Sequence, residues 1–398
     1  MELFWLEHKK LWRKKIVKIC VLLCFVYCVI FGSILSFQWF SFGSSDDYTS
    51  AFGNNFDGYT VIKDSQEYAL SFGGELTDET LQQIVSDYQQ MEADGMEEEL
   101  EKTDWQIVNS WLGTLYPELR DTSNYKTMIS YVDPDKLTGF YERRQQVLDE
   151  FLEVSGQVGA EKEFLHQIER KVEKPFHYEW VEGWSTLLGS MVADLGVVMA
   201  LFLGIVLSSL FAGEWHDNTS TLVLTTRNGW GKIALAKILT GLAFTVELFA
   251  LLAVSSVISQ LFFMGTAGWD MPIQNIKLIA VAPMNMLQAE IYEYAFVLLG
   301  AIGFAGIVMF ISAAVKNNVL TLLLSLAVVY GPMMIAEYLP YEMQKALDLI
   351  PLVGSSTDIF RTNTFRILGK LIWSPYLLIT IPVLIGILCM PFAIKSWS

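Results

Sequence analysis

The chain has 398 residues and a formal net charge of −16 at pH 7; 53% of its residues are hydrophobic and only 18% are charged. Its mean hydropathy is +0.38, whereas a soluble globular domain of this length carries more charge. The composition therefore excludes an ordinary soluble domain and predicts a polytopic membrane protein.

The apolar residues are gathered in blocks that match a membrane. A hydrocarbon core about 30 Å thick needs about 20 residues of helix to cross it. We expect six transmembrane helices, at roughly 17–40, 188–211, 238–263, 294–315, 319–337 and 375–394. The predicted fold class is an α-helical polytopic membrane protein with a mostly helical extracellular domain between spans one and two.

The N-terminal segment, MELFWLEHKKLWRKKIVKIC, does not look like a cleavable signal. The apolar run after it is too long, and no small-x-small cleavage site follows. Lys and Arg close to the spans predict the orientation. The N-terminal segment carries six of them, the inner loops and C-terminus five, and the short outer loops five. We expect both termini to be cytoplasmic, in a bacterial plasma membrane.

The predicted organisation separates an acidic domain from a membrane core. Residues 1–40 form a basic segment and the first span, 41–187 an extracellular domain, and 188–398 the remaining five spans. The last region has a cytoplasmic loop at 212–237 and extracellular loops at 264–293 and 338–374. Residues 41–186 hold 30 Asp and Glu against 11 Lys and Arg, so the acidity of the chain is concentrated there.

The extracellular domain shows helical and strand patterns. The stretches YTVI and EYALSF indicate a small hairpin. Thr77 is expected to cap a helix that starts with acidic residues. Helical spacing then recurs in two groups, Val147, Leu148, Phe151, Val154 and Val158, and Phe164, Leu165, Ile168 and Val172. The aromatic residues Tyr178, Trp180 and Trp184 are expected at the membrane interface.

All four cysteines fall in predicted spans, so the extracellular domain has no disulfide. Cys20, Cys24 and Cys28 share one helix face. Packing or lipid contact is the favoured interpretation, and a metal or lipidation site is the alternative.

The loop between spans two and three reads FAGEWHDNTSTLVLTTRNGWGKIALAK, residues 211–237. At 100° per residue, one side of a helix gathers Trp215, Thr219, Leu222 and Val223, while the other gathers Glu214, Asp217, Asn218, Thr221 and Thr225. Leu224 is the exception. The pattern predicts a short amphipathic helix on the membrane surface that could dock a partner. A plain connector with Trp215 and Trp230 at the interface is the alternative.

This loop resembles the first cytoplasmic loop of permease subunits of type-2 ABC exporters. In that family a Glu follows span two, then come a hydroxyl residue, a Leu-rich turn and a Lys that opens span three. The matching residues here are Glu214, Thr219, Leu222–Leu224 and Lys237. The family's Pro and Arg before span three are replaced by Arg227 and Trp230. The large insert after span one resembles a subgroup in Gram-positive bacteria.

The resemblance implies a coupling helix that sits in a groove of an ATPase subunit. The residues expected to dock or couple are Glu214, Trp215, Thr219, Leu222, Val223, Leu224 and Arg227. The chain has no G-x-x-x-x-G-K-[ST] motif. The chain is therefore not expected to be an enzyme, and ATP and Mg²⁺ would bind to a separate ATPase subunit. A second permease, either the same chain or a paralogue, is also implied.

The expected activity is export or clearance of a peptide or amphiphilic substrate. An acidic outer domain attracts cations at long range, which favours a basic, lantibiotic-like peptide; a merely solvated acidic surface is the alternative. A membrane sensor or immunity protein that binds a peptide without transport is the rival function, and an assembly scaffold is a third.

A few ionisable residues fall within or beside the spans. Glu247 lies about ten residues into span three, where an acidic side chain usually faces a bundle interior or a watery cavity. Its alternatives are a structural hydrogen bond to a neighbouring helix and a role in a pathway or dimer interface. Glu293 and Glu337 sit at predicted span ends and are expected to be interfacial. The histidines are scattered and form no catalytic or metal-binding motif.

Overall fold

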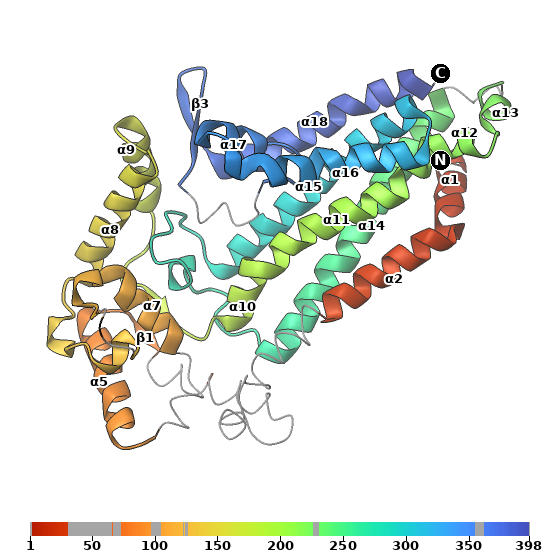
Figure 1. The fold of residues 1–398 in the computed structure, drawn as a ribbon. Helices are drawn as coiled ribbons and strands as arrows, with labels where there is room; N and C mark the ends of the chain where they lie inside the picture. Colours follow the sequence, from red (N-terminus) through yellow and green to blue (C-terminus); the bar gives the residue numbers. More distant parts are fainter. Residues whose placement is uncertain are drawn as a thin grey trace.

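The computed structural model describes residues 2–30, 66, 73–96, 105–121, 123, 126–225, 231–354 and 362–397. A bundle of long helices carries a smaller helical domain at one end (Figure 1). Both chain termini lie at the opposite end of the bundle. We call these the domain end and the terminal end, and we call the domain built from residues 73–187 the insert domain.

Five helices are long and apolar enough to cross a membrane, counted over the described residues. They are Asp194–His216, Gly231–Met264, Met286–Val315, Asn318–Tyr338 and Ser374–Trp397. The chain is therefore an α-helical, multi-pass membrane protein. Helix α2 (Lys15–Val29) covers only part of the predicted first span, because residues 31–40 lie outside the described residues. The arrangement of six spans stays a prediction.

Two of the bundle helices begin earlier than the apolar pattern suggested. Helix α14 (Gly231–Met264) has 34 residues, a length of about 50 Å. Helix α15 (Met286–Val315) begins at a capping box, in which the Asn285 and Gln288 side chains satisfy each other's backbone N–H groups. Glu293 therefore lies inside α15 with 0% exposure, and not at the end of a span as the sequence predicted. Glu337 is exposed at the end of α16 (Asn318–Ile335).

Helix α15 is the centre of the bundle and contacts α11 (Val192–Leu207), α14, α16 and α18 (Ser374–Trp397). It packs most closely on α18, at glycines. A Cβ atom on Gly306 would lie 2.4 Å from the Gly386 carbonyl oxygen, and one on Gly303 would lie 2.3 Å from that of Pro382. These glycines let the two backbones touch. On the other side, Cys20, Cys24 and Cys28 of α2 are buried in the bundle core.

Within its described residues, the insert domain contains four helices of ten residues or more and a short strand pair. The helices are α5 (Asp78–Ala93), α7 (Trp105–Leu115), α8 (Phe140–Val154) and α9 (Ala160–Glu169). Strand β1 (Gly74–Glu75) pairs antiparallel with β2 (His177–Tyr178). The predicted cap is confirmed, since the Thr77 hydroxyl accepts a hydrogen bond from the Thr80 N–H.

Other sequence predictions for the insert domain are only partly met. The helical spacing in the sequence continued to Val158, but helix α8 ends at Val154. Both valines are exposed, so the predicted apolar face extended too far. Gly156, with a φ of 75°, turns the chain there. The YTVI and EYALSF stretches of the predicted hairpin lie outside the described residues.

The insert domain is fixed to the bundle through the segment between α14 and α15. The Trp180 Nε1–H donates to the Met264 carbonyl and the Trp184 Nε1–H to the Thr266 carbonyl, both at 3.3 Å. Tyr178 and these two tryptophans are buried inside the protein, so their rings do not face lipid as those of an aromatic belt do. Their level relative to the membrane stays a prediction. Aromatic side chains with one polar atom suit this buried junction equally well, because each finds a carbonyl partner.

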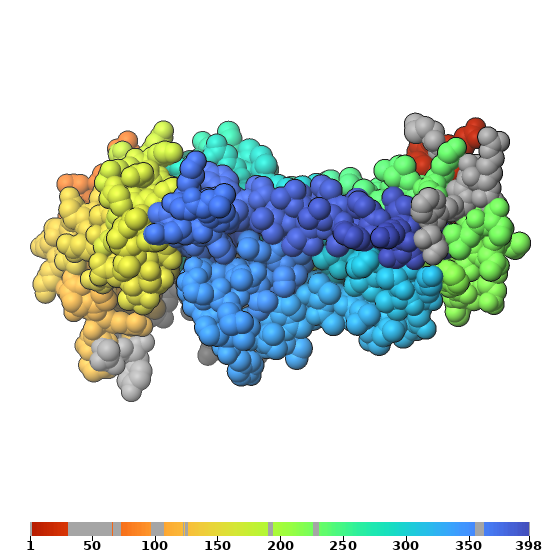
Figure 2. Space-filling model, turned by 90° about the horizontal axis from the view of Figure 1, so that it is seen from above, coloured from red at the N-terminus to blue at the C-terminus, as the bar shows by residue number. Residues whose placement is uncertain are grey.

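The domain end is completed by the segment before α18. Helix α17 (Tyr341–Leu347) precedes a hairpin of β3 (Thr364–Ile367) and β4 (Lys370–Trp373). Arg366 in the hairpin forms an ion pair with Glu161 of the insert domain. Seen from above, the molecule is elongated, with the insert domain at one extremity and α12–α13 (Ser209–His216 and Ser220–Thr225) at the other (Figure 2).

Candidate functional site

The loop singled out from the sequence lies at the terminal end and is not a single amphipathic helix. Helix α12 ends at His216 and α13 begins at Ser220. Between them Asn218 has a φ of 56°, a left-handed conformation that stops a helix. The prediction of one continuous helix from Glu214 is therefore wrong. Residues 226–230, which include Arg227 and Trp230, lie outside the described residues.

Glu214 is the centre of this region. Its side chain is only 5% exposed, although the sequence placed it on the polar, outward side. One carboxylate oxygen, Oε1, accepts hydrogen bonds from Lys10 and from Lys237, the latter at 3.0 Å. The other, Oε2, accepts from the Thr219 hydroxyl. Paired and hydrogen-bonded in this way, a carboxylate can be buried at an acceptable cost.

Lys237 closes the cluster from the side of α14. It is 2% exposed, and its Nζ also contacts Glu7 Oε2 at 2.9 Å and the Leu210 carbonyl at 3.0 Å. Glu7 and Lys10 belong to the N-terminal helix α1 (Glu2–Arg13). The cluster therefore joins α1, α12, the 217–219 turn and the start of α14 in one polar network.

The cluster borders a small cavity of about 30 Å³ that includes Lys14, Ser209 and Asp217. The Lys14 ammonium donates to the Ser209 hydroxyl at 2.9 Å. Burial and the positive charges of Lys237 and Lys10 lower the pKa of Lys14. Burial works against the charge on Lys10, but its bond to Glu214 and the nearby Glu7 raise its pKa. The pKa values of Lys10, within α1, and Lys14, just after it, are therefore shifted in opposite directions within one network.

Helix α13 presents one apolar residue outward. Leu222 is 70% exposed, whereas Val223 and Leu224 are half-buried against the bundle core. The sequence placed Leu222 and Val223 on one face and left Leu224 as the exception. Because α13 is a separate short helix, its orientation does not follow from that of α12. Within α13, Leu222 is the apolar side chain that is exposed.

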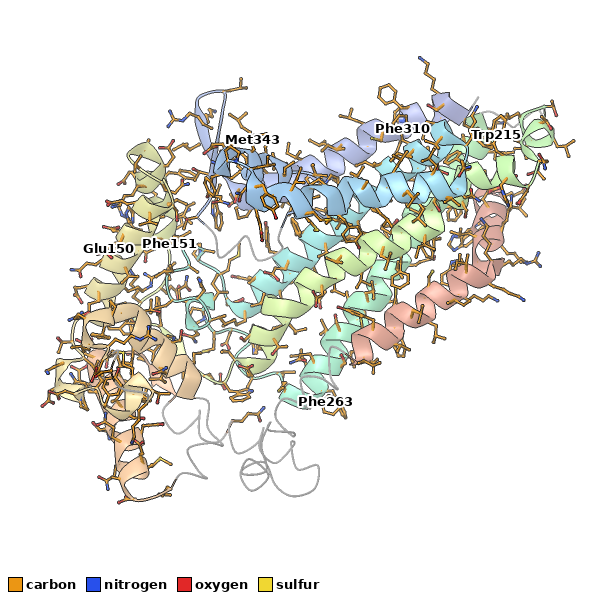
Figure 3. All side chains as sticks on the ribbon, in the orientation of Figure 1. Glu150, Phe151, Trp215, Phe263, Phe310 and Met343 are labelled. Carbon is orange, nitrogen blue, oxygen red and sulfur yellow. The ribbon has the colours of Figure 1, made fainter. Side chains whose placement is uncertain are left out.

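Trp215 lies at the same end of the bundle (Figure 3). It contacts Lys316 and Trp397. The Lys316 Nζ stands 4.2 Å above the Trp215 ring, a cation–π contact. The rings of Trp215 and Trp397 meet edge to face, with centroids 6.3 Å apart. Trp215 therefore connects α12 to the turn after α15 and to the C-terminal end of α18.

Ser312 of α15 is a positioning residue that the sequence did not reveal. The helix path breaks at Ser208, between α11 and α12. The buried Ser312 hydroxyl accepts from the backbone N–H groups of Phe211 and Ala212, at 3.2 and 3.0 Å, and donates to the Ser208 carbonyl at 2.7 Å. In the sequence, Ser312 stands out only as a hydroxyl residue within an otherwise apolar helix. Its partners lie about 100 residues away, so the sequence pattern could not identify them.

Glu247 does not face the bundle interior. Its side chain is 43% exposed and contacts the N-terminal helix α1. The Trp12 indole N–H donates to Glu247 Oε2 at 3.0 Å, and His8 Nε2 lies 3.1 Å from Oε1. Of the two interpretations drawn from the sequence, the hydrogen bond to a neighbouring helix matches this geometry.

A larger cavity of about 490 Å³ lies at the domain end, between the insert domain and the α14–α15 segment. Its lining is mixed and largely polar: Lys171, Glu173, His177, Asp270, Gln274 and Gln288 contribute to it. Among the residues that the structure describes, no three His, Cys, Asp or Glu side chains are grouped to hold a metal ion.

Comparison with protein-family models, curated proteins and solved structures gave no match to this chain. The arrangement at the terminal end can act mechanically. A force applied to α13 would pass through buried ionic contacts to α1, α12 and α14 at once. A simple surface loop would leave α1, α12 and α14 unconnected to one another, whereas this network links them.

Proposed function

We propose that the chain is the membrane-spanning permease subunit of an ATP-driven ABC exporter of type 2, belonging to a Gram-positive subgroup with a large extracellular insert. A separate ATPase subunit binds ATP and Mg²⁺. A second permease, the same chain or a paralogue, completes the transport unit. The substrate is a peptide or amphiphile, of the kind that antimicrobial peptides represent, moved across or cleared from the plasma membrane.

The observation that carries the proposal is the Glu214 cluster. Three of the residues that carry the resemblance, Glu214, Thr219 and Lys237, are spread over 24 positions of sequence. They meet through hydrogen bonds at 2.5 and 3.0 Å in a single buried network. The network anchors α13, whose Leu222 is exposed at the tip of the molecule. A docking helix needs both features: a rigid attachment to the protein, which the network provides, and an exposed apolar side chain for the partner to contact, which is Leu222.

The proposal fixes the orientation of the molecule. The terminal end faces the cytoplasm, where the ATPase resides, and the insert domain faces outward. The bias of Lys and Arg toward the N-terminal segment and inner loops supports this orientation. The acidic insert domain then stands where a cationic peptide would arrive, and the cavity at the domain end gives such a peptide polar contacts.

The test is binding to the proposed ATPase subunit, with Leu222→Asp as the variant. Leu368→Asp is the matched control, because Leu368 is 99% exposed in the turn at the domain end. A charge in the centre of an apolar contact is costly when it is desolvated. We expect Leu222→Asp to weaken ATPase binding at least tenfold and to abolish stimulation of ATP hydrolysis, while Leu368→Asp behaves as the wild type.

Equal ATPase binding by both variants would overturn the docking role of α13. A chain that binds an external peptide, yet neither binds the ATPase nor stimulates it, would instead be a sensor or immunity protein. Binding of the ATPase that depends on Leu222 would exclude a passive assembly scaffold.

A further inference from the structure

Two carboxylates near the domain end of α15 are buried with no basic partner among the described residues. Glu290 is 3% exposed and Glu293 is 0% exposed. None of their four carboxylate oxygens has a hydrogen bond of good geometry within the described residues, although the Tyr294 hydroxyl interacts with Glu290. The two side chains are three residues apart and therefore lie on one face of the helix. Buried ionisable groups in membrane helices are costly and usually functional.

Among the described residues, no basic side chain of the bundle is close to this pair. In the helices that contact α15, and in α2, the basic residues lie toward the terminal end: Lys15, Lys18, His216, Lys232, Lys237 and Lys395. At the domain end, Arg144 is paired with Glu169 and Arg366 with Glu161. The partial positive charge of the α15 N-terminus acts over the first turn, which the Asn285 capping box already occupies.

Neutral oxygen groups surround the carboxylates instead. The Tyr294 hydroxyl, one turn beyond Glu290, is 2.7 Å from Ser256 Oγ on α14. Helices α14 and α15 run antiparallel, and Ser256 of α14 contacts Tyr294 of α15. One turn further along α14 is Gln260, and it lies level with Glu290, which is one turn earlier on α15. Gln260 is 0% exposed, and neither its Oε1 nor its Nε2 has a hydrogen-bond partner. A second buried polar side chain without a partner thus lies beside the pair.

We propose that Glu290 and Glu293 bind a hard metal cation, with Gln260 and the hydroxyls of Tyr294 and Ser256 completing the oxygen ligands. Carboxylate, amide and hydroxyl oxygens are the ligands that Ca²⁺, Mg²⁺ and similar ions take in proteins. Two carboxylates balance the charge of one divalent ion. Because the site is enclosed and α15 begins about 6 Å before Glu290, the occupant is a small ion entering from the domain end.

This site is separate from the Glu214 cluster and does not depend on the proposed transport activity. The bound cation would tie α14 to α15 at the end that carries the insert domain. It would balance the negative charge of the two carboxylates inside the bundle.

The experiment measures the thermal unfolding midpoint of the full chain in detergent after treatment with a chelator. CaCl₂, MgCl₂ and NaCl are then added at equal ionic strength. We expect at least one ion, with Ca²⁺ or Mg²⁺ favoured by charge, to raise the midpoint by about 5 °C or more at saturation. The Glu290→Gln, Glu293→Gln double variant should lose this shift, and Gln260→Leu should reduce it. The ion that acts identifies the occupant.

Glu337→Gln is the control, because Glu337 is an exposed carboxylate at the end of α16; it should keep the full shift. If the double variant does not fold, the two single variants replace it, each losing at least half of the shift. The proposal is overturned if the wild type responds to none of the three ions, which would mean that the carboxylates are held neutral by protons. It is also overturned if the charge-removing variants respond as the wild type does.

Discussion

Glu214 stabilises the terminal end through two oxygens that serve three separate elements. Lys10 reaches it from α1, Lys237 from α14 and Thr219 from the turn before α13. The sequence suggested these residues by their order, but it predicted the wrong environment for Glu214. A helical projection assigns a charged residue to the solvent side by default. It contains no information about distant residues, and Lys10 is more than 200 residues away from Glu214 in the sequence.

Replacing Glu214 with Gln tests this network at the residue scale. The variant keeps the shape of the side chain but leaves Lys237 buried, with Glu7 as its remaining acid. Removing one member of a buried ion pair costs about 3–5 kcal/mol, and because Glu7 remains we expect a loss of about 3 kcal/mol. Denaturant unfolding of the purified chain in detergent measures this loss.

Asp217→Asn provides the comparison for Glu214→Gln, because Asp217 is an exposed acid in the same turn. A surface substitution of this kind changes the free energy of unfolding by less than about 0.5 kcal/mol. Equal effects of the two substitutions would mean that the cluster contributes general surface charge and no specific buried bond.

At the scale of elements, the contact between α15 and α18 depends on glycine. The apolar pattern predicted both helices as spans, yet it did not indicate that they would touch along their backbones. Hydropathy reports how apolar a segment is and carries little information on which neighbour it meets. The close approach at Gly303, Gly306 and Gly386 explains why these positions carry no side chain.

Gly306→Ala should separate the two helices. The added Cβ would lie 2.4 Å from the Gly386 carbonyl oxygen, which is backbone and cannot rotate away. Overpacking of this kind costs about 1–3 kcal/mol, so we expect the thermal midpoint of Gly306→Ala to fall. Gly113→Ala in α7 is the matched control, since nothing lies within 4 Å of a Cβ there. Alanine in an open helix interior is favourable by about 0.5–1 kcal/mol, and a fall in both midpoints would contradict the packing argument.

At the scale of the whole molecule, α14 connects the two ends. It begins beside the Glu214 cluster and ends at Met264, which is buried in the core of the insert domain. Figure 3 labels Phe263 near this far end and Trp215 at the other. The apolar blocks predicted most of this helix and its place in the chain order. They did not predict how the insert domain attaches. Arg144 donates to the backbone carbonyls of Leu278 and Ala280, and every residue has such a carbonyl, so no pattern of side chains reveals these partners.

The attachment of the insert domain should depend on pH. Arg144 is fully buried, and its Nη1 lies 2.6 Å from Glu169 Oε1, which Lys174 also contacts at 2.9 Å. Burial alone would raise the pKa of Glu169, but the hydrogen bonds from Lys174 and Arg144 hold it below its ordinary value. A lowered pKa means that the stabilisation is complete above the unfolded pKa of about 4.3 and is lost as pH falls through the folded pKa.

We therefore expect the thermal midpoint of the wild type to be steady from neutral pH down to about 5 and to fall below about pH 4. Glu169→Gln should lower the midpoint at neutral pH, because it leaves Arg144 buried without its acid, and should flatten the decline between pH 4 and 3. Glu163→Gln is the control, since Glu163 is exposed in the same helix, and it should keep the wild-type profile. Parallel profiles for the wild type and Glu169→Gln would show that other carboxylates govern the acid response, and that the Arg144 contacts to the 278–280 carbonyls hold the insert domain in place without Glu169.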